Sequence, residues 1–442
     1  MRVARAARDI GIETVSVYSS ADRDSRHVSV TDHSVCIGAP SPSASYLRRE
    51  LLVHVAGMTG CDAVHPGYGF LSEDADFAHQ VNDAGLVWVG PPADAIRQMG
   101  DKAKARTVAA ENEVPLVPGS EGVLTSEEDA VAFGRRHGFP LLLKASAGGG
   151  GKGMRVVAHE QELSAMLALA RQEATGAFGD DTMYVERYLP RVRHVEVQVL
   201  ADAAGKVAAL GDRDCSMQRR HQKVVEEAPA TDLAPESRAE MSDAAVRLAR
   251  AVDYRGAGTV EFLLDVDTGA FYFIEMNTRI QVEHTVTEEI TQTDLVAWQL
   301  RIAGGESLQS LGAVAPSGHA IEFRITAEDP ARDFAPTPGR IEVFEIPGGP
   351  GIRCDTHCYP GYVVPTYYDS LLAKLVVRGR DRDESIRRAR RALREFRVDG
   401  VTTTIGFHQW LLDQAEFTAG TYTTSYLTDL IGRSNNLQEA LG

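Results

Sequence analysis

The stretch that decides the fold is Glu-Met-Asn-Thr-Arg-Ile-Gln-Val-Glu, from Glu275 to Glu283. In an extended chain successive side chains point to opposite faces, so one face here is entirely polar. The polar residues are Glu275, Asn277, Arg279, Gln281 and Glu283. The other face is apolar or β-branched. This alternation is typical of an amphipathic strand with its polar side in water, and it also suits a strand that lines a polar site.

A hairpin that leads into this stretch favours the polar site. Residues 257–265 have strand character, residues 267–269 (Asp-Thr-Gly) supply a turn, and residues 270–274 resume the strand. Folding the hairpin about its turn places Glu261 opposite Glu275. Two carboxylates side by side on paired strands repel each other unless a cation lies between them. We therefore expect a divalent cation with oxygen ligands, most commonly Mg²⁺ carrying nucleotide phosphates.

Length and charge limit the classes of protein. At 442 residues the chain is too long for one core, so two or three domains are expected. A formal net charge of −16 argues against nucleic acid as a partner, but not against a nucleotide substrate. No apolar run approaches a membrane span. The cysteines are scattered, which indicates free thiols in a reducing cytosol: Cys36, Cys61, Cys215, Cys354 and Cys358.

Helical and strand signals alternate over the first hundred residues. A helix over 2–10 precedes a strand over 14–18, and similar pairs follow, which predicts a parallel sheet with helices on its faces. The basic residues at 1–8 are compatible with a transit peptide, but Asp9 and Glu13 follow too soon, so we interpret this segment as domain structure. The loop His65-Pro-Gly-Tyr-Gly69 is either a functional turn after a strand or a simple Pro-Gly turn.

A glycine-rich loop separates two predicted strands, 140–144 and 155–158. It reads Ala147-Gly-Gly-Gly-Gly-Lys-Gly-Met154, and its backbone N–H groups could close on phosphate oxygens. Gly153 follows Lys152 where a Walker A loop has Ser or Thr, so we interpret the loop as a lid over a nucleotide, with a linker as the alternative. Lys144, at the end of its strand, requires an anionic partner.

A second group of candidates is cationic. Residues 218–223 (Gln-Arg-Arg-His-Gln-Lys) form either a solvated charged run or an anion pocket, and the apolar residues on both sides favour the pocket. Lys102 begins a predicted helix and suits solvent as well as it suits a ligand. Beyond residue 318 strand signals dominate and indicate an α+β unit. Arg324 lies in the middle of one of these strands, where a charge implies a partner.

With these segments assembled, the sequence resembles the biotin carboxylase subunit or domain of the biotin-dependent carboxylases (acetyl-/acyl-CoA carboxylase type), in the ATP-grasp superfamily. The resemblance extends from about residue 2 to about residue 426. Its motifs are His65-Pro-Gly-Tyr-Gly-Phe-Leu-Ser-Glu73, Lys144 with Gly148–Met154, Arg213 through Pro229, Tyr254–Thr259, Phe273–His284 and Tyr367-Tyr-Asp-Ser370.

The resemblance implies an α/β and α+β multidomain fold. It implies an N-terminal Rossmann-like pre-ATP-grasp domain over 1–100, an ATP-grasp domain over 101–316 with a glycine-loop lid at about 117–189, a C-terminal α+β biotin carboxylase domain over 317–430, and a tail over 431–442. The family opens with a strand before its first helix, and this chain starts in that helix. We therefore expect either that the true start lies upstream or that the first domain is destabilised.

The implied reaction is ATP-dependent carboxylation of biotin with bicarbonate, through carboxyphosphate, as the first half-reaction of an acetyl-CoA or other acyl-CoA carboxylase, an activity of fatty acid biosynthesis. The cofactors would be ATP, Mg²⁺ (or Mn²⁺) and biotin on a separate carrier. The given sequence has no biotinylation lysine between two methionines, so we expect the carrier either on a separate chain or beyond this fragment. The implied partners are a biotin carboxyl carrier protein or domain and a carboxyltransferase subunit. A homodimer in the cytoplasm is expected, with no nucleic acid and no membrane, and the final carboxyl acceptor is left open.

The resemblance also assigns roles to residues. Glu283 would be the base, with Arg279, Lys223 and Arg324 as further catalytic residues, and Arg324 would stabilise the biotin enolate. Bicarbonate would be bound by Lys223, Arg279, Gln281 and Val282, and the metal by Glu261, Glu275 and Asn277. The nucleotide would contact Lys102, Lys144, Gly148, Gly149, Gly150, Gly151, Lys152, Gly153, Met154, Glu186, Arg187, Leu189, His194, Gln218 and His221.

Two other functions stay open at this point. One is a different ATP-grasp enzyme, a carboxylate–amine ligase or a carbamoyl-phosphate-type enzyme, which residues 218–223 and Arg324 disfavour. The other is a degenerate subunit that only scaffolds its partners, which the suitable residue at every assigned position disfavours. One departure from the family pattern is Thr285, which stands where the family usually has proline.

Overall fold

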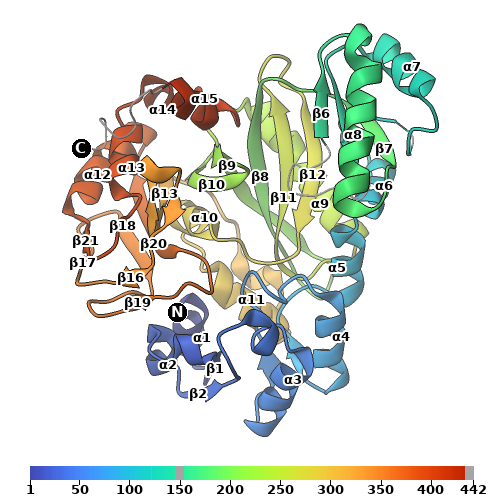
Figure 1. Cartoon of the computed structure of the whole chain (residues 1–442). Coiled ribbons are helices and arrows are strands. Elements are labelled where there is room, and N and C mark those ends of the chain that lie inside the picture. Colours follow the sequence, from blue (N-terminus) through green and yellow to red (C-terminus); the bar gives the residue numbers. More distant parts are fainter. Residues whose placement is uncertain (121, 146–153, 434–442) are drawn as a thin grey trace. The chain divides into compact units, whose positions relative to one another are not determined.

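The computed structural model of the chain describes residues 1–120, 122–145 and 154–433. The chain divides into two compact units, coloured along the sequence in Figure 1. The larger unit combines Met1–Val114, Arg193–Phe262 and Ile274–Gly442, and the smaller unit combines Pro115–Val192 and Leu263–Phe273. The glycine loop predicted as a lid, Gly148–Gly153, lies outside the described residues.

The first hundred residues of the larger unit alternate between helices and strands, as predicted. Two pairs of short strands are parallel: β1 with β2 and β3 with β4. The elements are α1 (Arg2–Asp9), β1 (Val15–Tyr18), α2 (Arg26–Val30), β2 (His33–Cys36), α3 (Arg49–Met58), β3 (Ala63–Val64), α4 (Ala75–Asp83), β4 (Val87–Trp88), α5 (Ala93–Gly100) and α6 (Lys102–Glu111), with short 3₁₀ turns at Ser20–Asp22 and Pro42–Ala44.

An eight-stranded sheet supports the rest of the larger unit, in the order β12-β11-β8-β9-β10-β13-β20-β18. The neighbouring pairs β8/β9, β9/β10, β10/β13, β13/β20 and β18/β20 are antiparallel. The elements up to the β12–α11 region are β8 (Val192–Ala201), β9 (Val207–Arg219), β10 (Gln222–Ala228), α9 (Pro235–Ala251), β11 (Gly256–Asp265), β12 (Phe271–Asn277), α10 (His284–Thr291), α11 (Leu295–Ala303) and the 3₁₀ turn Leu308–Leu311.

The same sheet continues past residue 316, where the sequence suggested a domain boundary. Strand β13 pairs with β10, so strands from both sides of that limit share backbone hydrogen bonds. The remaining elements are β13 (His319–Thr326), β14 (Glu328–Asp329), the 3₁₀ turn Pro330–Arg332, β15 (Ala335–Pro336), β16 (Gly339–Arg340), β17 (Val343–Glu345), β18 (Ile352–Thr356), β19 (Val363–Val364), β20 (Leu371–Gly379), α12 (Arg382–Glu395), β21 (Arg397–Asp399), α13 (Ile405–Leu411), α14 (Ala415–Ala419) and α15 (Tyr426–Arg433).

Helices cover both faces of the β10–β13–β20 part of this sheet. On one face, Val286 and Ile290 of α10 pack against Ala228, Ala320 and Val376. On the other face, residues of α12, α13 and α14 pack against Val225, Ile321 and Phe323 in a larger apolar cluster. Successive residues of a strand point to opposite faces of the sheet. Two consecutive residues of β10, or of β13, therefore contact different helices.

The prediction that residues 275–283 form one strand is wrong beyond Asn277. Strand β12 ends there, and the chain turns into α10, which begins at His284. The Glu73 side chain accepts hydrogen bonds from the Thr278 backbone N–H (3.2 Å) and from the Arg279 Nε (3.0 Å). These bonds hold residues 278 and 279 outside the strand. The predicted hairpin itself is confirmed, since β11 and β12 are neighbours in the sheet.

The smaller unit has its own antiparallel sheet in the order β6-β5-β7 and its own apolar core. Helix α7 begins with a capping box, in which Ser126 and Asp129 satisfy each other's backbone N–H groups. Its elements are α7 (Glu127–His137), β5 (Leu141–Ala145), β6 (Met154–Val157), the 3₁₀ turn Glu160–Glu162, α8 (Leu163–Phe178) and β7 (Met183–Arg187).

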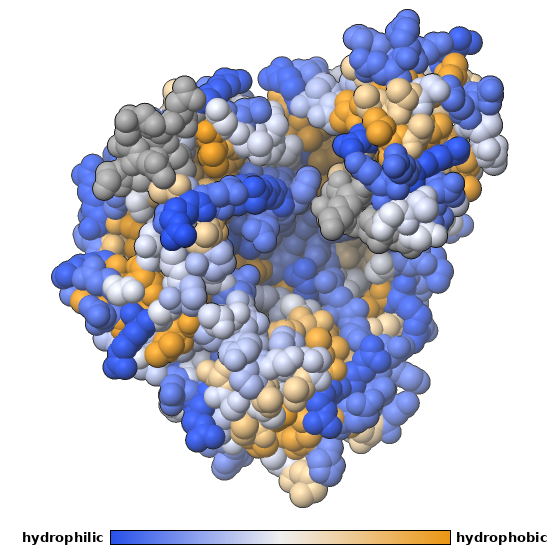
Figure 2. Space-filling model, in the orientation of Figure 1, coloured by the Kyte–Doolittle hydropathy of each residue, from blue (hydrophilic) through white to orange (hydrophobic). Residues whose placement is uncertain are grey.

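The visible surface is largely hydrophilic, with smaller groups of hydrophobic residues between the hydrophilic ones (Figure 2). Among the described residues, none of the helices combines the length and the apolar composition that crossing a bilayer requires.

Candidate active site

The centre of the larger unit is lined by polar side chains that alternate along its strands. On β8, His194, Glu196 and Gln198 share one face and all are buried. Arg213 on β9 and Glu261 on β11 are buried beside them. A fully buried strand can carry such a polar row only if the side chains satisfy one another, because an unpaired buried charge is costly.

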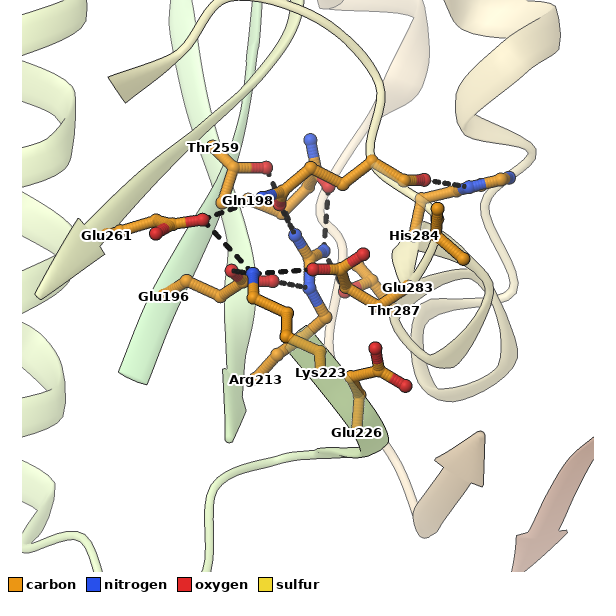
Figure 3. Close-up of polar contacts among 12 residues, drawn as sticks. Glu196, Gln198, Arg213, Lys223, Glu226, Thr259, Glu261, Glu283, His284 and Thr287 are labelled. Atoms are coloured by element: carbon orange, nitrogen blue, oxygen red, sulfur yellow. Dashed lines mark hydrogen bonds and ion pairs between the residues drawn. The ribbon is translucent and has the colours of Figure 1, made fainter. Parts of the chain in front are cut away.

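Lys223 is the cation at the middle of this centre. Its Nζ donates to carboxylates of Glu196 (2.7 Å), Glu261 (3.1 Å) and Glu283 (2.6 Å), as Figure 3 shows. Burial disfavours the charged amine, but its negative neighbours outweigh burial and raise the pKa of Lys223 well above the usual value. Lys223 is therefore a fixed positive charge among three carboxylates.

Glu283 lies between two cations. One oxygen accepts from Lys223, and the other accepts from Arg324 Nη2 at 3.1 Å. Burial opposes ionisation, yet Lys223, Arg324 and Arg213 together hold the pKa of Glu283 well below its usual range. This residue is also the N-cap of α10, but its side chain makes no capping bond. Glu283 is an ionised, immobilised carboxylate.

Arg324 has the partner that its mid-strand position implied. Its Nε donates to Glu226 at 2.6 Å, so the guanidinium joins Glu226 to Glu283. Burial opposes the charge, but Glu226 and Glu283 outweigh it and raise the pKa of Arg324 above its usual value. Burial also raises the pKa of Glu226, to about 8; Arg324 counteracts the rise, and Glu322 and Glu283 add to it.

The residues expected to bind a metal lie at the β11–β12 hairpin. Glu261 accepts from Asn277 Nδ2 and Gln281 Nε2, each at 2.8 Å. Burial and then the Glu261 carboxylate raise the pKa of Glu275, which is the like-charge repulsion that the hairpin argument predicted. Two carboxylates and an amide oxygen are the hard ligands that Mg²⁺ prefers, and a cation would relieve the repulsion. The donor set therefore fits a magnesium ion.

A second group of potential ligands adjoins this one. His194, Glu196 and Glu261 bring one ligand atom each within 4.8 Å of one another. His194 Nε2 lies 3.0 Å from Glu261, and although burial opposes its charge, Glu261 raises the pKa of His194. His194 therefore lies against Glu261, one of the residues expected to bind the metal.

Arg279 is held at the edge of the centre. Besides its bond to Glu73, it donates from Nη2 to the Asn277 Oδ1 at 2.8 Å. Val282 contributes its carbonyl oxygen to Lys374 Nζ at 2.7 Å. The polar residues predicted at 277, 281 and 283 meet at Glu261 and Lys223, although only Asn277 of the three lies on a strand.

The cationic run at 218–223 is divided by the fold. Arg220 and His221 form the exposed turn of the β9–β10 hairpin, both with positive φ, while Gln218 is buried opposite Lys223. Arg219 and Arg220 pair with Asp333, on the exposed side. Gln218 and Lys223, at the two ends of this run, face the centre, while Arg219 and Arg220 pair with Asp333 instead.

The remaining predicted nucleotide residues are distributed over both units. In the larger unit, Lys102 begins α6 and its charge lowers the pKa of Glu275, opposing the rise caused by burial and Glu261. In the smaller unit, Lys144 pairs with the buried Glu186 and lies over the Tyr184 ring at 5.8 Å from its centroid. Arg187 ends β7, the Leu189 side chain is buried, and Met154 begins β6.

Several residues of this centre had no role in the sequence interpretation. They are Glu73, Glu196, Arg213, Glu226, Glu322 and Lys374. The His-Val-Glu-Val-Gln alternation from His194 was a usable signal for Glu196, because polar residues on one face of a strand between apolar ones indicate a shared polar site. Glu226 gave no such signal, since nothing local distinguishes it from Glu227.

Comparison with protein families gives three matches along the chain. Residues 1–96 match the family described as biotin carboxylase, N-terminal domain. Residues 101–311 match carbamoyl-phosphate synthase L chain, ATP binding domain, and residues 322–429 match biotin carboxylase C-terminal domain.

Full-length relatives point the same way. The chain is 50% identical to biotin carboxylase 1 of Bacillus subtilis over 428 residues, 97% of this chain and 95% of that protein. It is 49% identical to the biotin carboxylase of Pseudomonas aeruginosa over 434 residues, 98% and 96% of the two chains.

Solved structures also resemble the chain over nearly its full length. The biotin carboxylase complex from Campylobacter jejuni has a TM-score of 0.90 at 43% identity and covers 97% of this chain and 96% of its own. The biotin carboxylase domain of a thermophilic 2-oxoglutarate carboxylase, solved with bicarbonate bound, has a TM-score of 0.93 at 41% identity and covers 100% and 96%.

Proposed function

This chain belongs to the biotin carboxylase family, and we propose that it catalyses the ATP-dependent carboxylation of carrier-bound biotin by bicarbonate. The observation that carries this proposal is the position of Glu283, whose two oxygens are held by Lys223 and Arg324. A carboxylate fixed between cations stays ionised at neutral pH, and its orientation for accepting a proton is fixed.

Bicarbonate would lie at this cluster of donors. Lys223, Arg279 and the amide of Gln281 supply positive charge and N–H groups, and Val282 contributes its backbone. Glu283 would accept the bicarbonate proton, so that the oxygen thus freed attacks the γ-phosphate of ATP and forms carboxyphosphate and ADP. Positioning and charge stabilisation of this kind supply most of the catalysis in phosphoryl transfer.

Glu261, Glu275 and Asn277 would hold Mg²⁺, which neutralises charge on the phosphates when it is bound. We assign further nucleotide contacts within each unit separately. In the larger unit they are Lys102, His194, Gln218 and His221. In the smaller unit they are Lys144, Glu186, Arg187 and Leu189, with Met154 and the preceding glycine loop.

Arg324 would stabilise the biotin enolate formed when the ureido nitrogen loses its proton. In the structure this guanidinium is held by Glu226 and Glu283, so its position is fixed before biotin arrives. Carboxyphosphate would supply the carboxyl group, and phosphate would leave. The partners that follow are a biotin carboxyl carrier and a carboxyltransferase, which selects the final acceptor.

We also propose a homodimer in the cytoplasm. One of the similar structures is described as the dimer of a biotin carboxylase domain, with MgADP, ADP and bicarbonate. We keep the predicted division into domains over 1–100, 101–316 and 317–430 as part of this proposal. An amine-ligase activity is less suitable, because it gives no role to Arg324.

The test is bicarbonate-dependent ATP hydrolysis with and without free biotin. We expect Glu283→Gln to lower both rates by about 10²–10⁴-fold, as for loss of a general base. Arg324→Ala should remove most of the biotin stimulation, about 10²-fold or more, as for loss of a charge that stabilises a developing anion, while leaving more of the biotin-independent rate.

Matched controls come from exposed positions on α9. Glu240→Gln and Arg250→Ala make the same chemical changes at the surface and should keep both rates. The proposal would be contradicted if the rate of ATP hydrolysis by native protein did not depend on bicarbonate or biotin. Full activity of Glu283→Gln would also contradict it.

A further inference from the structure

Arg213 is a fully buried arginine whose hydrogen-bonding capacity is fully used. Its Nε donates to Glu196 (2.5 Å), Nη1 to Gln198 (2.7 Å) and Thr287 (2.9 Å), and Nη2 to Thr259 (3.0 Å) and Gln281 (2.8 Å), several of which Figure 3 shows. A guanidinium has five N–H donors. Each therefore has one acceptor, and the acceptors come from β8, β11, α10 and the loop before α10.

This arrangement determines the direction of the Gln281 amide. Oxygen and nitrogen of a side-chain amide are assigned from the hydrogen-bond network, and arginine can only donate. The Gln281 atom that faces Arg213 must therefore be the oxygen. The amide nitrogen is left facing the centre, where it donates to Glu261 at 2.8 Å. An anion near Glu261 and Lys223 would thus meet N–H groups instead of a carbonyl oxygen.

The same guanidinium acts on Lys223 through Glu196. One Glu196 oxygen accepts from Arg213, and the other accepts from Lys223 Nζ at 2.7 Å. Because the Glu196 carboxylate is anchored on one side, the lysine that it holds has a fixed position on the other. Burial raises the pKa of Glu283, and three cations lower it. Arg213 has the third largest effect among them, after Lys223 and Arg324.

We propose that Arg213 is a positioning residue for bicarbonate, which orients the Gln281 amide and, through Glu196, the Lys223 amine toward the anion. This inference rests on the proposed function, because it names the residue that prepares that same site. Arg213 itself makes no contact with substrate: its five donors are all engaged inside the protein. Its removal should therefore affect bicarbonate binding far more than nucleotide binding.

The test compares Michaelis constants. Arg213→Lys keeps the charge but loses the planar fork, so it cannot hold Gln281 and Glu196 together. We expect the KM for bicarbonate in ATP hydrolysis to rise by about 10-fold or more, as for loss of a hydrogen bond to a charged group, with the KM for MgATP changed less than about 2-fold. Thr287→Val removes one anchor of the guanidinium on α10 and should raise the same constant by a few-fold.

Arg193 provides the matched control. It is also buried, and it donates to Asp214 of β9 and to the Thr231 carbonyl instead of to Gln281 or Glu196. Arg193→Lys should lower the thermal midpoint without changing the KM for bicarbonate. If Arg193→Lys raises this constant as much as Arg213→Lys does, the effect is only structural and the proposal is wrong.

A double-mutant cycle gives the sharper readout. If Arg213 acts on the anion mainly through Gln281, then Arg213→Lys should add little to the KM effect of Gln281→Met, because coupled residues are non-additive. Fully additive effects would overturn the route through Gln281, and KM values for bicarbonate and MgATP that rise together would overturn the whole inference. Native protein without bicarbonate-dependent hydrolysis would instead contradict the proposed function, so the two failures are distinguishable.

Discussion

Glu226 and Glu227 are consecutive residues on β10, both fully buried, yet they have opposite surroundings. Strand alternation sends Glu226 to the face covered by α10 and Glu227 to the face covered by α12. Their cross-strand partners on β13 are Glu322 and Ile321. The two faces of one strand can therefore be compared at equal burial.

Glu227 is surrounded by donors. It accepts from His319 Nε2 (2.6 Å), from Arg382 Nε (2.7 Å) and Nη2 (3.1 Å), and from the Tyr422 hydroxyl. Burial opposes ionisation, but His319 and Arg382 outweigh it and lower the pKa of Glu227. This carboxylate ties β10 to β13, to α12 and to the segment before α15, which is a structural role.

Glu226 has one donor residue, Arg324, for one of its oxygens. Within the described part of the chain, Glu226 Oε2 and Glu322 Oε1 are buried without a hydrogen-bond partner. Two neighbouring buried acids cannot both be ionised at low cost, so a proton stays on this pair to a higher pH than usual. The number of donors, and not the depth of burial, thus separates the structural carboxylate from the one beside the active centre.

The largest effect on stability should come from removing the Glu227 carboxylate, whose hydrogen bonds are satisfied. Glu227→Gln leaves Arg382 and His319 without their carboxylate, and removing one partner of a buried ion pair costs about 3–5 kcal/mol. We expect urea-induced unfolding of this variant at a clearly lower midpoint, with the KM for bicarbonate unchanged below that midpoint. Ordinary surface substitutions change the free energy of unfolding by about 0.5 kcal/mol or less. If Glu227→Gln lowers it by less than about 1 kcal/mol, the proposed difference between the two faces is wrong.

Tyr422→Phe should have the next largest effect. It removes one donor to the Glu227 carboxylate and leaves the ring, and a hydrogen bond to a charged group contributes about 1.5–3 kcal/mol. The measurement is the same unfolding experiment. Because Tyr426, also near the C-terminal end, pairs with Glu416 on the exposed side, Tyr426→Phe is a matched control that should change stability by less than about 1 kcal/mol.

Glu226→Gln should change the pH dependence of stability. The pKa of Glu226 is raised in the folded protein to about 8, so the folded state retains a proton that the unfolded state releases from about pH 4.5 upward. Its contribution is complete below the unfolded pKa and is lost as the pH rises through about 8. The free energy of unfolding of native protein should fall over this window by at most about 1.4 kcal/mol per pH unit.

In Glu226→Gln the amide does not titrate, so that part of the slope should disappear, which urea unfolding at pH 6, 7, 8 and 9 would show. In native protein above pH 8, an ionised Glu226 would neutralise the charge of Arg324. The Glu226→Gln variant has no such carboxylate, so it should retain biotin stimulation above pH 8. An unchanged slope would mean that Glu226 is as ionised as Glu227.

The smallest effect concerns Thr285, in the first turn of α10. Its hydroxyl donates to Glu322, and burial raises the pKa of Glu322 while this bond lowers it in part. Thr285→Val should cost about 1 kcal/mol or less near pH 6, where the acid pair keeps its proton. The cost should increase toward pH 9, where the ionised Glu322 has lost its donor. A pH-independent cost would contradict this account.

Much of the centre could be predicted from sequence because its signals are local. Glu261 and Glu275 are brought together by one hairpin, and the residues Asp267-Thr268-Gly269 predict its turn. The alternation of helices and strands near the N-terminus predicted parallel pairing, which the structure has. Family motifs supplied the assigned roles of Glu283, Lys223 and Arg324, which stay predictions until the kinetic tests above are made.

Other features could not be predicted locally. Just beyond the end of β12, Thr278 and Arg279 donate to Glu73, which lies 205 and 206 residues earlier in the sequence. The run at 218–223 is divided because its middle is a hairpin turn. The strand pairing of β10 with β13 joins segments on both sides of a predicted domain limit.

The sequence by itself determined which polar residues are available and that they alternate along strands, because the strand period is a local property of the backbone. It did not distinguish Glu226 from Glu227, and it gave no role to Arg213. Only the tertiary structure decided these, since the number of donors and acceptors around a buried charge is set by helices and strands distant in sequence: α10 and β13 around Glu226, α12 around Glu227, and β8, β11 and α10 around Arg213.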